Sequence, residues 1–432
     1  MTLLIDISRL VENLHLQTPT GIDRVEMAYV LHFLQHSDRH DLRFVVTWPA
    51  FTGILNVDHV RPLIEDASAR WEARAQDIDR DQTLQALRRA LTMPADTSAE
   101  SPLHVGQSDQ RKGVADQVTA ASVWLRSMLN PLAGRALAEL RHRGAWYLHV
   151  SQFRLNRPKR FQWMRPANVR GLFMLHDLIP IIHPEYCRPG EASRHAARVE
   201  TMIARASVIV ANSEFTRQSL TARVGIGSLP RCEVVPLGIS AAFVSGAAIP
   251  PIQSGIPYFV VIGTIEPRKN LEFLLTLWRR WTDHGRVPRA RLVIVGRRGW
   301  EIESVANLLD RSVGLAPTVI EARALSDSGM IALLKGAAAL IAPSWVEGFG
   351  LPVAEALALG VPVLASDIAA HREVGGAFAD YIGPVDGRGW TQALDDYAAP
   401  DSERRRSRLT ALKSYRPTTW PDHMARVEAL MR

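Results

Sequence analysis

Short runs of apolar residues alternate along the chain with amphipathic stretches of helical periodicity. In the first half, the apolar runs predict strands at 3–7, 42–47, 145–150, 171–175, 208–211 and 233–236. The amphipathic stretches predict helices at 24–34, 190–205 and 215–223. Strands that alternate with helices are typical of α/β folds with parallel sheets. The first half is therefore predicted to form one domain of this kind.

The same alternation starts again in the second half. Apolar runs predict strands at 258–263, 291–295, 318–321, 338–342 and 361–365. Helices are predicted near 271–281, 301–311, 327–335 and 353–359. We therefore predict the α/β class, with two doubly wound domains of similar size.

A segment rich in Gly, Pro and Ala lies between the two halves at 245–257. Such a composition is typical of an interdomain linker. It separates an N-terminal domain, 1–244, from a C-terminal domain, 258–400, and helices at 401–432 are expected to follow and to return to the N-terminal domain. Because ligands bind beyond the carboxyl ends of parallel strands, two such domains that face each other enclose a binding cleft.

An insertion at 61–143 breaks this rhythm within the N-terminal domain. The highly charged stretch 61–91 is predicted to be helical, and the polar stretch 94–112 to be a mobile loop. Residues 119–143 are predicted to be helical again, with an interruption at Pro131. Five apolar residues near helical spacing lie there: Trp124, Leu125, Met128, Leu129 and Leu132. This helix either packs on the domain core or lies with its apolar side on a membrane surface.

The charge of the chain is concentrated in one segment. The 432 residues carry a formal net charge of +7, and residues 135–170 hold nine Lys or Arg against one acidic residue, Glu139. This segment indicates an anionic partner such as a membrane surface, a nucleic acid or a phosphorylated substrate, although a solvated helix face in an Arg-rich protein has the same composition. Because no RNA- or DNA-binding motif accompanies it, we expect no nucleic-acid partner.

The composition and the missing motifs exclude several classes of protein. The chain has two cysteines and neither a CxxC pair nor an HExxH motif, so we expect no metal site. It has no P-loop, no complete GxGxxG and no GxSxG. No apolar run approaches the length of a membrane span, and the N-terminus does not resemble a signal peptide. We therefore expect a cytoplasmic protein, peripheral at the inner face of the cell membrane.

The strongest chemical signal is the stretch 345–367, where a predicted strand is followed by a Gly-rich loop and a helix that begins at Pro352. Gly348 and Gly350 allow a ligand to approach the backbone, and the N-terminus of the helix favours an anion. Glu347 in the loop and Glu355 in the predicted first helical turn can face one ligand, and carboxylates accept hydrogen bonds from hydroxyl groups. A structural turn followed by a helix has the same pattern.

Three further loops follow predicted strands. Arg268 and Lys269 lie after the strand that ends at Gly263, where they can neutralise a diphosphate leaving group. His176 follows the strand at 171–175 and can act as a hydrogen-bond donor or as a general acid or base. Gly21 precedes a helix near the first strand and leaves room for a phosphate or an acceptor. Each loop taken alone is also compatible with a purely structural role.

The stretch 345–367 resembles the E-x7-E signature of retaining family 4 glycosyltransferases of the group 1 type, which have the GT-B fold of two Rossmann-like domains. The resemblance covers most of the chain except 61–143. It places Glu347 near the transferred sugar and Glu355 on the nucleotide ribose, with the backbone of Gly348, Phe349, Gly350 and Leu351 on the sugar and phosphates. The nucleobase is expected at 320–325.

The other loops resemble motifs of the same family. Lys269 matches the Lys of a diphosphate-binding loop written G-R-x-x-P-x-K, in which Thr264 replaces the Arg and Arg268 can substitute for it. His176 matches a histidine near the donor sugar. Gly21 matches a G-G-I-x-R loop in which Thr20 replaces one Gly.

The resemblance implies a retaining hexosyltransferase that uses a nucleotide-diphosphate sugar, with mannose preferred, and a glycan or polyprenyl-diphosphate-linked acceptor in cell-surface polysaccharide synthesis. It implies no metal and no cofactor. The anionic membrane surface would contact residues 119–170. Two alternatives stay open at this point: a sugar-nucleotide epimerase of the same fold, and a non-catalytic protein that binds an anionic ligand.

Overall fold

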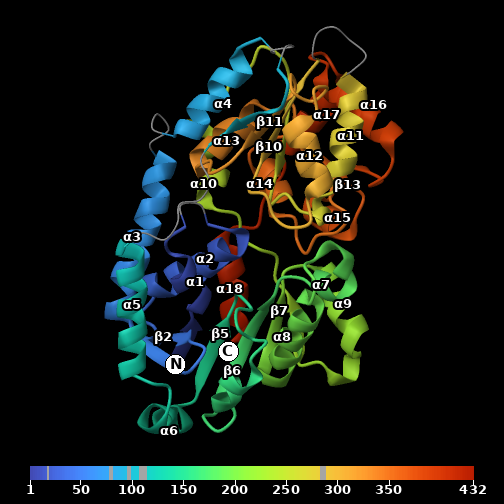
Figure 1. Ribbon diagram of the computed structural model, residues 1–432. Helices are drawn as coiled ribbons and strands as arrows, with labels where there is room; N and C mark the ends of the chain where they lie inside the picture. Colours follow the sequence, from blue (N-terminus) through green and yellow to red (C-terminus); the bar gives the residue numbers. More distant parts are fainter. Residues whose placement is uncertain (17–18, 77–80, 95–98, 107–113, 283–288) are drawn as a thin grey trace.

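The computed structural model contains two seven-stranded sheets that belong to two domains, one above the other in Figure 1. It describes residues 1–432 except 17–18, 77–80, 95–98, 107–113 and 283–288. Both sheets have helices on both faces, which confirms the prediction of two doubly wound α/β domains.

The N-terminal sheet has the strand order β3-β2-β1-β5-β6-β7-β8. Its strands are β1 (Thr2–Asp6), β2 (Asp41–Thr47), β3 (Thr52–Asn56), β5 (Ala145–His149), β6 (Val169–Leu175), β7 (Ala206–Ala211) and β8 (Arg231–Val234). All pairs are parallel except β2 with β3. Successive residues of a strand point to opposite faces, so Leu3 and Ile5 lie in one apolar core while Leu4 lies in another.

The C-terminal sheet has the order β14-β13-β12-β9-β10-β11-β4 and is parallel throughout. Its strands are β4 (Leu103–Val105), β9 (Tyr258–Ile262), β10 (Arg291–Val295), β11 (Val319–Ala322), β12 (Ala339–Ala342), β13 (Val363–Ser366) and β14 (Asp380–Ile382). The five strands predicted in this half are all present. Strands β3, β4 and β14 were not predicted from the sequence.

The helices cover both faces of each sheet. In the first half they are α1 (Ser8–Asn13), α2 (Gly21–Gln35), α3 (Val57–Gln76), α4 (Gln82–Thr92), α5 (Val114–Leu129), α6 (Gly134–Arg143), α7 (Ile179–Ile182), α8 (Glu191–Arg205), α9 (Glu214–Val224) and α10 (Ala241–Val244). In the second half they are α11 (Leu271–Thr282), α12 (Glu303–Arg311), α13 (Asp327–Gly336), α14 (Leu351–Ala358), α15 (Ala369–Gly375), α16 (Gly387–Ala398), α17 (Glu403–Leu412) and α18 (Trp420–Leu430).

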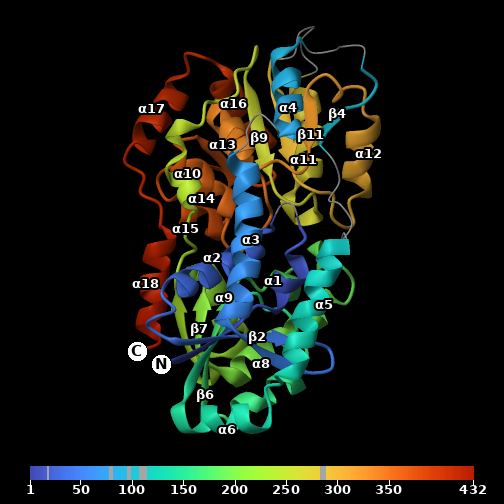
Figure 2. The ribbon, with the colours of Figure 1, turned by 90° about the vertical axis from the view of Figure 1, so that its left-hand side faces the viewer.

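The insertion at 61–143 contributes to both domains, which was not predicted from the sequence. Helix α3 packs on α2 and on strands β2 and β3, rises past the domain boundary and also contacts α13 (Figure 2). Strand β4 then pairs with β11 of the C-terminal sheet, within a stretch predicted to be a loop, most of which lies outside the described residues. The Thr83 hydroxyl donates to the Arg323 carbonyl at 3.1 Å, and the Ser326 amide donates to Asp81 at 3.0 Å. These bonds fasten α4 to the C-terminal domain.

The second part of the insertion returns to the N-terminal domain, where α5 packs beside β3. The predicted helical stretch is present, and it is interrupted between α5 and α6, where Pro131 lies, as expected. The two helices form the lower left edge of the molecule in Figure 1.

Two other segments connect the domains. The linker predicted at 245–257 already lies against the C-terminal domain, since α10 packs on α13 and α14 and the Ile252 amide donates to the Ala332 carbonyl at 3.0 Å. The chain therefore crosses before α10, earlier than predicted. Helix α18 returns to the N-terminal domain, as expected, and Tyr29 Oη lies 2.8 Å from His423 Nε2. Helix α17 stays on the C-terminal domain, where Arg404 pairs with Asp380 at 2.8 Å.

Candidate functional site

The loop between β12 and α14 holds Glu347 in a buried cluster of charges. Its carboxylate accepts from the Lys269 ammonium at 2.6 Å and from the Ser344 hydroxyl at 2.8 Å, and it also pairs with the Arg268 guanidinium. Burial opposes ionisation, but the two cations outweigh it and hold the pKa of Glu347 well below its ordinary value. Glu347 is therefore an anion at any physiological pH.

The loop between β9 and α11 supplies the two cations. Gly263 has φ 138°, and a Cβ there would lie 2.9 Å from Lys269 Cε, so the glycine leaves space for the lysine stem. Arg268 is also bound by Glu266, at 2.5 Å. Burial lowers the pKa of Arg268, but Glu347 and Glu266 together raise it above its ordinary value. Thr264 lies at the start of this loop, beside Gly299.

The N-terminus of α14 lies next to this cluster. Gly350 is its N-cap with φ 96°, and among the described residues no side chain caps the helix. A helix start of this kind presents N–H groups and positive partial charge to an anion. Helix α14 starts at Leu351, one residue before the predicted start, and Phe349 is nearly buried.

His371 lies beside Gly350 at the start of α14 and was not predicted from the sequence. Its Cδ2 atom would lie 3.3 Å from a Cβ on Gly350, while its Nδ1 lies 3.0 Å from the Ser366 carbonyl oxygen. Burial lowers its pKa, so the ring is predominantly neutral. Its position in a polar stretch after a predicted strand was the available sequence signal.

The N-terminal domain touches the same loop through His176 and the start of α9. A Cβ on Gly348 would lie 2.3 Å from the His176 carbonyl oxygen, and the Ser213 hydroxyl donates to the Gly348 carbonyl at 2.6 Å. His176 Nε2 lies 2.6 Å from the Val150 carbonyl oxygen, so this nitrogen carries the proton. Burial lowers the pKa of His176, which leaves a neutral ring whose Nδ1 can accept but not donate.

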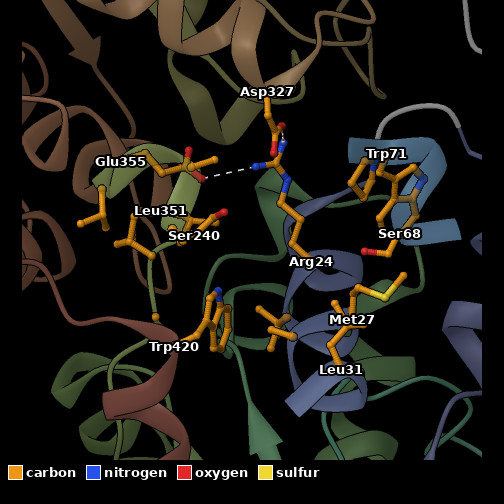
Figure 3. Close-up of a pocket in the computed structure, with 18 of the residues that line it drawn as sticks. Arg24, Met27, Leu31, Ser68, Trp71, Ser240, Asp327, Leu351, Glu355 and Trp420 are labelled. Carbon is orange, nitrogen blue, oxygen red and sulfur yellow. Dashed lines mark hydrogen bonds and ion pairs between the residues drawn. The ribbon is translucent and has the colours of Figure 1, made fainter. Parts of the chain in front are cut away.

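Glu355 faces a separate space, a cavity of about 1410 Å³ between the two domains (Figure 3). Its described lining includes Leu351 and Glu355 of α14 and Ala324–Asp327 after β11, together with Arg24 of α2. Glu355 lies in the second turn of α14, so the prediction of a first-turn position was wrong. It is four residues after Leu351, on the same side of the helix and about 6 Å along its axis.

The structure thus brings the predicted residues together in two groups joined by α14. Glu347, Arg268, Lys269, Gly348 and Gly350 lie at its start, with His176 across the domain boundary. Glu355 lies further along, in the cavity. Gly21 is the first residue of α2, and a Cβ added there would meet no described atom within 4 Å.

The two charged residues next to Glu355 in the cavity, Arg24 and Asp327, were not predicted. Arg24 Nη2 lies 2.6 Å from Asp327 Oδ1, and its Nη1 lies 3.5 Å from Glu355 Oε1. Arg24 stands within the G-G-I-x-R-like stretch, but no local pattern connects it with a residue 303 positions away.

The described ranges contain no group of three or more His, Cys, Asp or Glu side chains arranged to hold a metal ion. None of the helices in these ranges has the length and apolar character that crossing a membrane requires.

Comparisons with known proteins agree with this geometry. Residues 247–382 match the sequence model of the family described as "Glycosyl transferases group 1". The serotype-specific mannosyltransferase WbdA of Escherichia coli is 26% identical over 251 residues, which cover 55% of this chain and 31% of WbdA. The O-antigen chain mannosyltransferase B of Escherichia coli is 27% identical over 277 residues, which cover 56% of this chain and 68% of that protein. The chain thus spans about a third of the length of WbdA.

A solved structure resembles the whole chain. Anabaena HepE in complex with UDP and glucose superposes with a TM-score of 0.57 and 14% identity, covering 100% of this chain and 99% of HepE. With its two doubly wound α/β domains, the chain has the GT-B fold predicted from the sequence.

Proposed function

We propose that this chain moves a hexosyl unit from a nucleotide-diphosphate sugar to a glycan or lipid-linked acceptor, with retention of configuration, because residues 247–382 match the model of the group 1 glycosyltransferases. One observation carries the proposal: α14 runs from a cluster of two cations and one carboxylate to a cavity that holds a second carboxylate. This spacing suits a donor whose diphosphate lies between a sugar and a nucleoside.

The diphosphate would bind at the start of α14, against Lys269 and Arg268. Lys269 is paired with Glu347, and Arg268 with both Glu347 and Glu266, so the two cations face two carboxylates and the cluster is charge-balanced. A diphosphate that takes over part of this pairing would free the Glu347 carboxylate to accept hydrogen bonds from the sugar hydroxyls. The same cations would stabilise the negative charge that develops on the leaving phosphate.

The acceptor would enter over the N-terminal domain, beside His176. Neutral His176 can accept a hydrogen bond from a sugar hydroxyl, but its protonated nitrogen is held by the Val150 carbonyl. It therefore orients the sugar rather than acting as an acid. We assign the removal of the acceptor proton to the leaving phosphate oxygen, so that no protein nucleophile is needed.

We prefer a mannosyl donor and a role in cell-surface polysaccharide synthesis, since two relatives are named serotype-specific mannosyltransferase WbdA and O-antigen chain mannosyltransferase B. Product analysis with GDP-mannose tests this together with the chemistry. Transfer to an added acceptor supports the proposal. Conversion of the donor without acceptor would indicate an epimerase, and binding without turnover would indicate a non-catalytic protein.

Lys269→Ala is expected to raise the KM for the donor about tenfold or more, because the diphosphate loses one charge-assisted hydrogen bond. Initial rates measured against donor concentration check this. Lys413→Ala, which changes an exposed lysine of the same domain, serves as the control. An unchanged KM in Lys269→Ala would remove Lys269 from the donor site.

EDTA is expected to leave the rate unchanged, since the two cations supply the charge that a metal would otherwise provide.

We also propose that α5 docks on an anionic membrane surface. Four large apolar side chains of α5 are exposed by 41% to 73%, namely Trp124, Leu125, Met128 and Leu129, which we term the α5 patch. Two cations lie near it. Arg126 is on the same helix. Arg160 Nη2 donates to the Pro49 carbonyl at 2.5 Å, and Phe51, two residues after Pro49, contacts the ring of Trp124. An exposed apolar helix edge bordered by cations is typical of a lipid interface.

The double variant Leu125→Ser/Leu129→Ser is expected to bind vesicles of anionic phosphatidylglycerol about tenfold more weakly, because two apolar side chains no longer leave water. Co-sedimentation at low salt measures this. Val313→Ser changes an exposed apolar residue of the C-terminal domain and should have no effect. If the wild-type chain does not bind these vesicles, the docking proposal is wrong.

A further inference from the structure

Arg24 projects from the N-terminal domain into the cavity between the two domains, toward Asp327 and Glu355 of the C-terminal domain (Figure 3). It is the fourth residue of α2, whose start is held by a capping box. The Thr20 amide donates to Asp23 at 2.9 Å, and Asp23 is fully buried and also bound by Arg9 at 2.9 Å. The helix therefore holds the base of the Arg24 side chain in a defined place.

The guanidinium group of Arg24 contacts two carboxylates, one at a shorter and one at a longer distance. The 2.6 Å contact with Asp327 is a charge-assisted hydrogen bond, whereas the 3.5 Å contact with Glu355 is longer than a normal hydrogen bond. Asp327 is the first residue of α13, where the helix dipole stabilises an anion. Glu355 can thus turn to a new partner while Arg24 remains on Asp327.

The ionisation of Glu355 depends on this arrangement. Burial raises the pKa of Glu355 to about 7, Arg24 acts against this, and Asp327 adds to it. Among the described residues, these two are the charged groups whose fields act on Glu355. Without Arg24, the carboxyl group would face Asp327 alone and would hold its proton to higher pH.

We propose that Arg24, anchored by Asp327, is a positioning residue that keeps Glu355 charged and oriented for the ribose hydroxyls of the nucleotide. The inference rests on the proposed function, in which Glu355 binds the ribose. A carboxylate accepts hydrogen bonds from both hydroxyls of a ribose, and a neutral carboxyl group accepts them less well. Because Arg24 belongs to the N-terminal domain, both domains contribute to the nucleoside site.

Isothermal titration of the full chain tests the proposal, using GDP and UDP and then the 2′-deoxy form of whichever binds more tightly. The variants are Arg24→Ala, Arg24→Lys and Glu355→Gln, with Arg143→Ala as a control at an exposed position distant in the chain. Wild type should prefer the ribonucleotide about tenfold, as expected for one hydrogen bond to a charged group. Thermal unfolding checks that each variant is folded.

Arg24→Ala is expected to lose about tenfold in ribonucleotide affinity at pH 7 and most of the preference over the deoxynucleotide. In wild type, the affinity should decline as the pH falls through about 7. In Arg24→Ala, the same decline should begin at a higher pH, because the Glu355 carboxyl group then holds its proton more tightly. Arg24→Lys should restore part of the preference, since it keeps a cation.

An unchanged ribose preference in Arg24→Ala, with a reduced one in Glu355→Gln, would overturn this inference alone. An unchanged preference in Glu355→Gln would instead remove Glu355 from the ribose site of the proposed function. Failure of the wild-type chain to bind either nucleotide would overturn both.

Discussion

Replacing Glu347 by glutamine is expected to lower kcat about 100- to 1000-fold, the range for losing one charged group that acts on the reacting centre. Glutamine keeps the size of the side chain but cannot neutralise Lys269 and Arg268, which lie against the carboxylate. In the proposed complex the diphosphate takes over part of the pairing with these cations, and a neutral amide accepts hydrogen bonds from the sugar hydroxyls less strongly than a carboxylate does. Because the pKa of Glu347 lies well below its ordinary value, the wild-type carboxylate should add no pH dependence above pH 5.

The measurement is single-turnover kinetics with a donor whose binding to the variant is confirmed by titration. Glu272→Gln, which changes an exposed glutamate of α11, is the matched control and should turn over normally. Near-normal turnover of Glu347→Gln would refute the assignment of Glu347 to the transferred sugar.

Gly348→Ala is expected to destabilise the contact between the two domains by about 1–3 kcal/mol and to abolish most of the turnover. The added Cβ would lie 2.3 Å from the His176 carbonyl oxygen, and a backbone oxygen cannot rotate away as a flexible side chain can. Gly348 is not among the residues with positive φ, so alanine is allowed by the local backbone and the effect arises from the contact between the domains. The Ser213 bond to the Gly348 carbonyl would be lost with it.

Thermal unfolding and donor turnover are measured together, and small-angle scattering reports whether the domains have separated. Gly227→Ala is the control, since its Cβ would meet no described atom within 4 Å and its φ is not positive. If Gly348→Ala melts and turns over like wild type, the contact between His176 and Gly348 does not form in solution.

The strands could be predicted where apolar side chains of neighbouring helices cover both faces of the sheet. Strands β9 to β13 have long runs of apolar residues because helices cover both faces of the sheet, and these runs stand out in the sequence. Strand β4 has no such signal, since Leu103 and His104 are exposed. It is a strand because β11 offers a free edge, and that edge belongs to a part of the chain more than 200 residues away.

The proposed donor site could likewise be predicted only in part. Lys269, Arg268 and Glu347 were predicted because each follows a strand, and the carboxyl ends of parallel strands meet at one edge of a sheet. That the three side chains pair with one another was not predictable, because it depends on how two loops 78 residues apart approach.

By itself, the sequence determined the class of fold, the two repeated domains and the loops that carry the chemistry, because periodicity, glycine and proline act over a few residues. Only the tertiary structure decided that the insertion joins both sheets and that Gly348 touches His176. It likewise decided that Arg24 meets Asp327 and Glu355. Ion pairs and steric contacts depend on distances of a few ångströms, and the docking of the two domains sets those distances between residues that no local pattern relates.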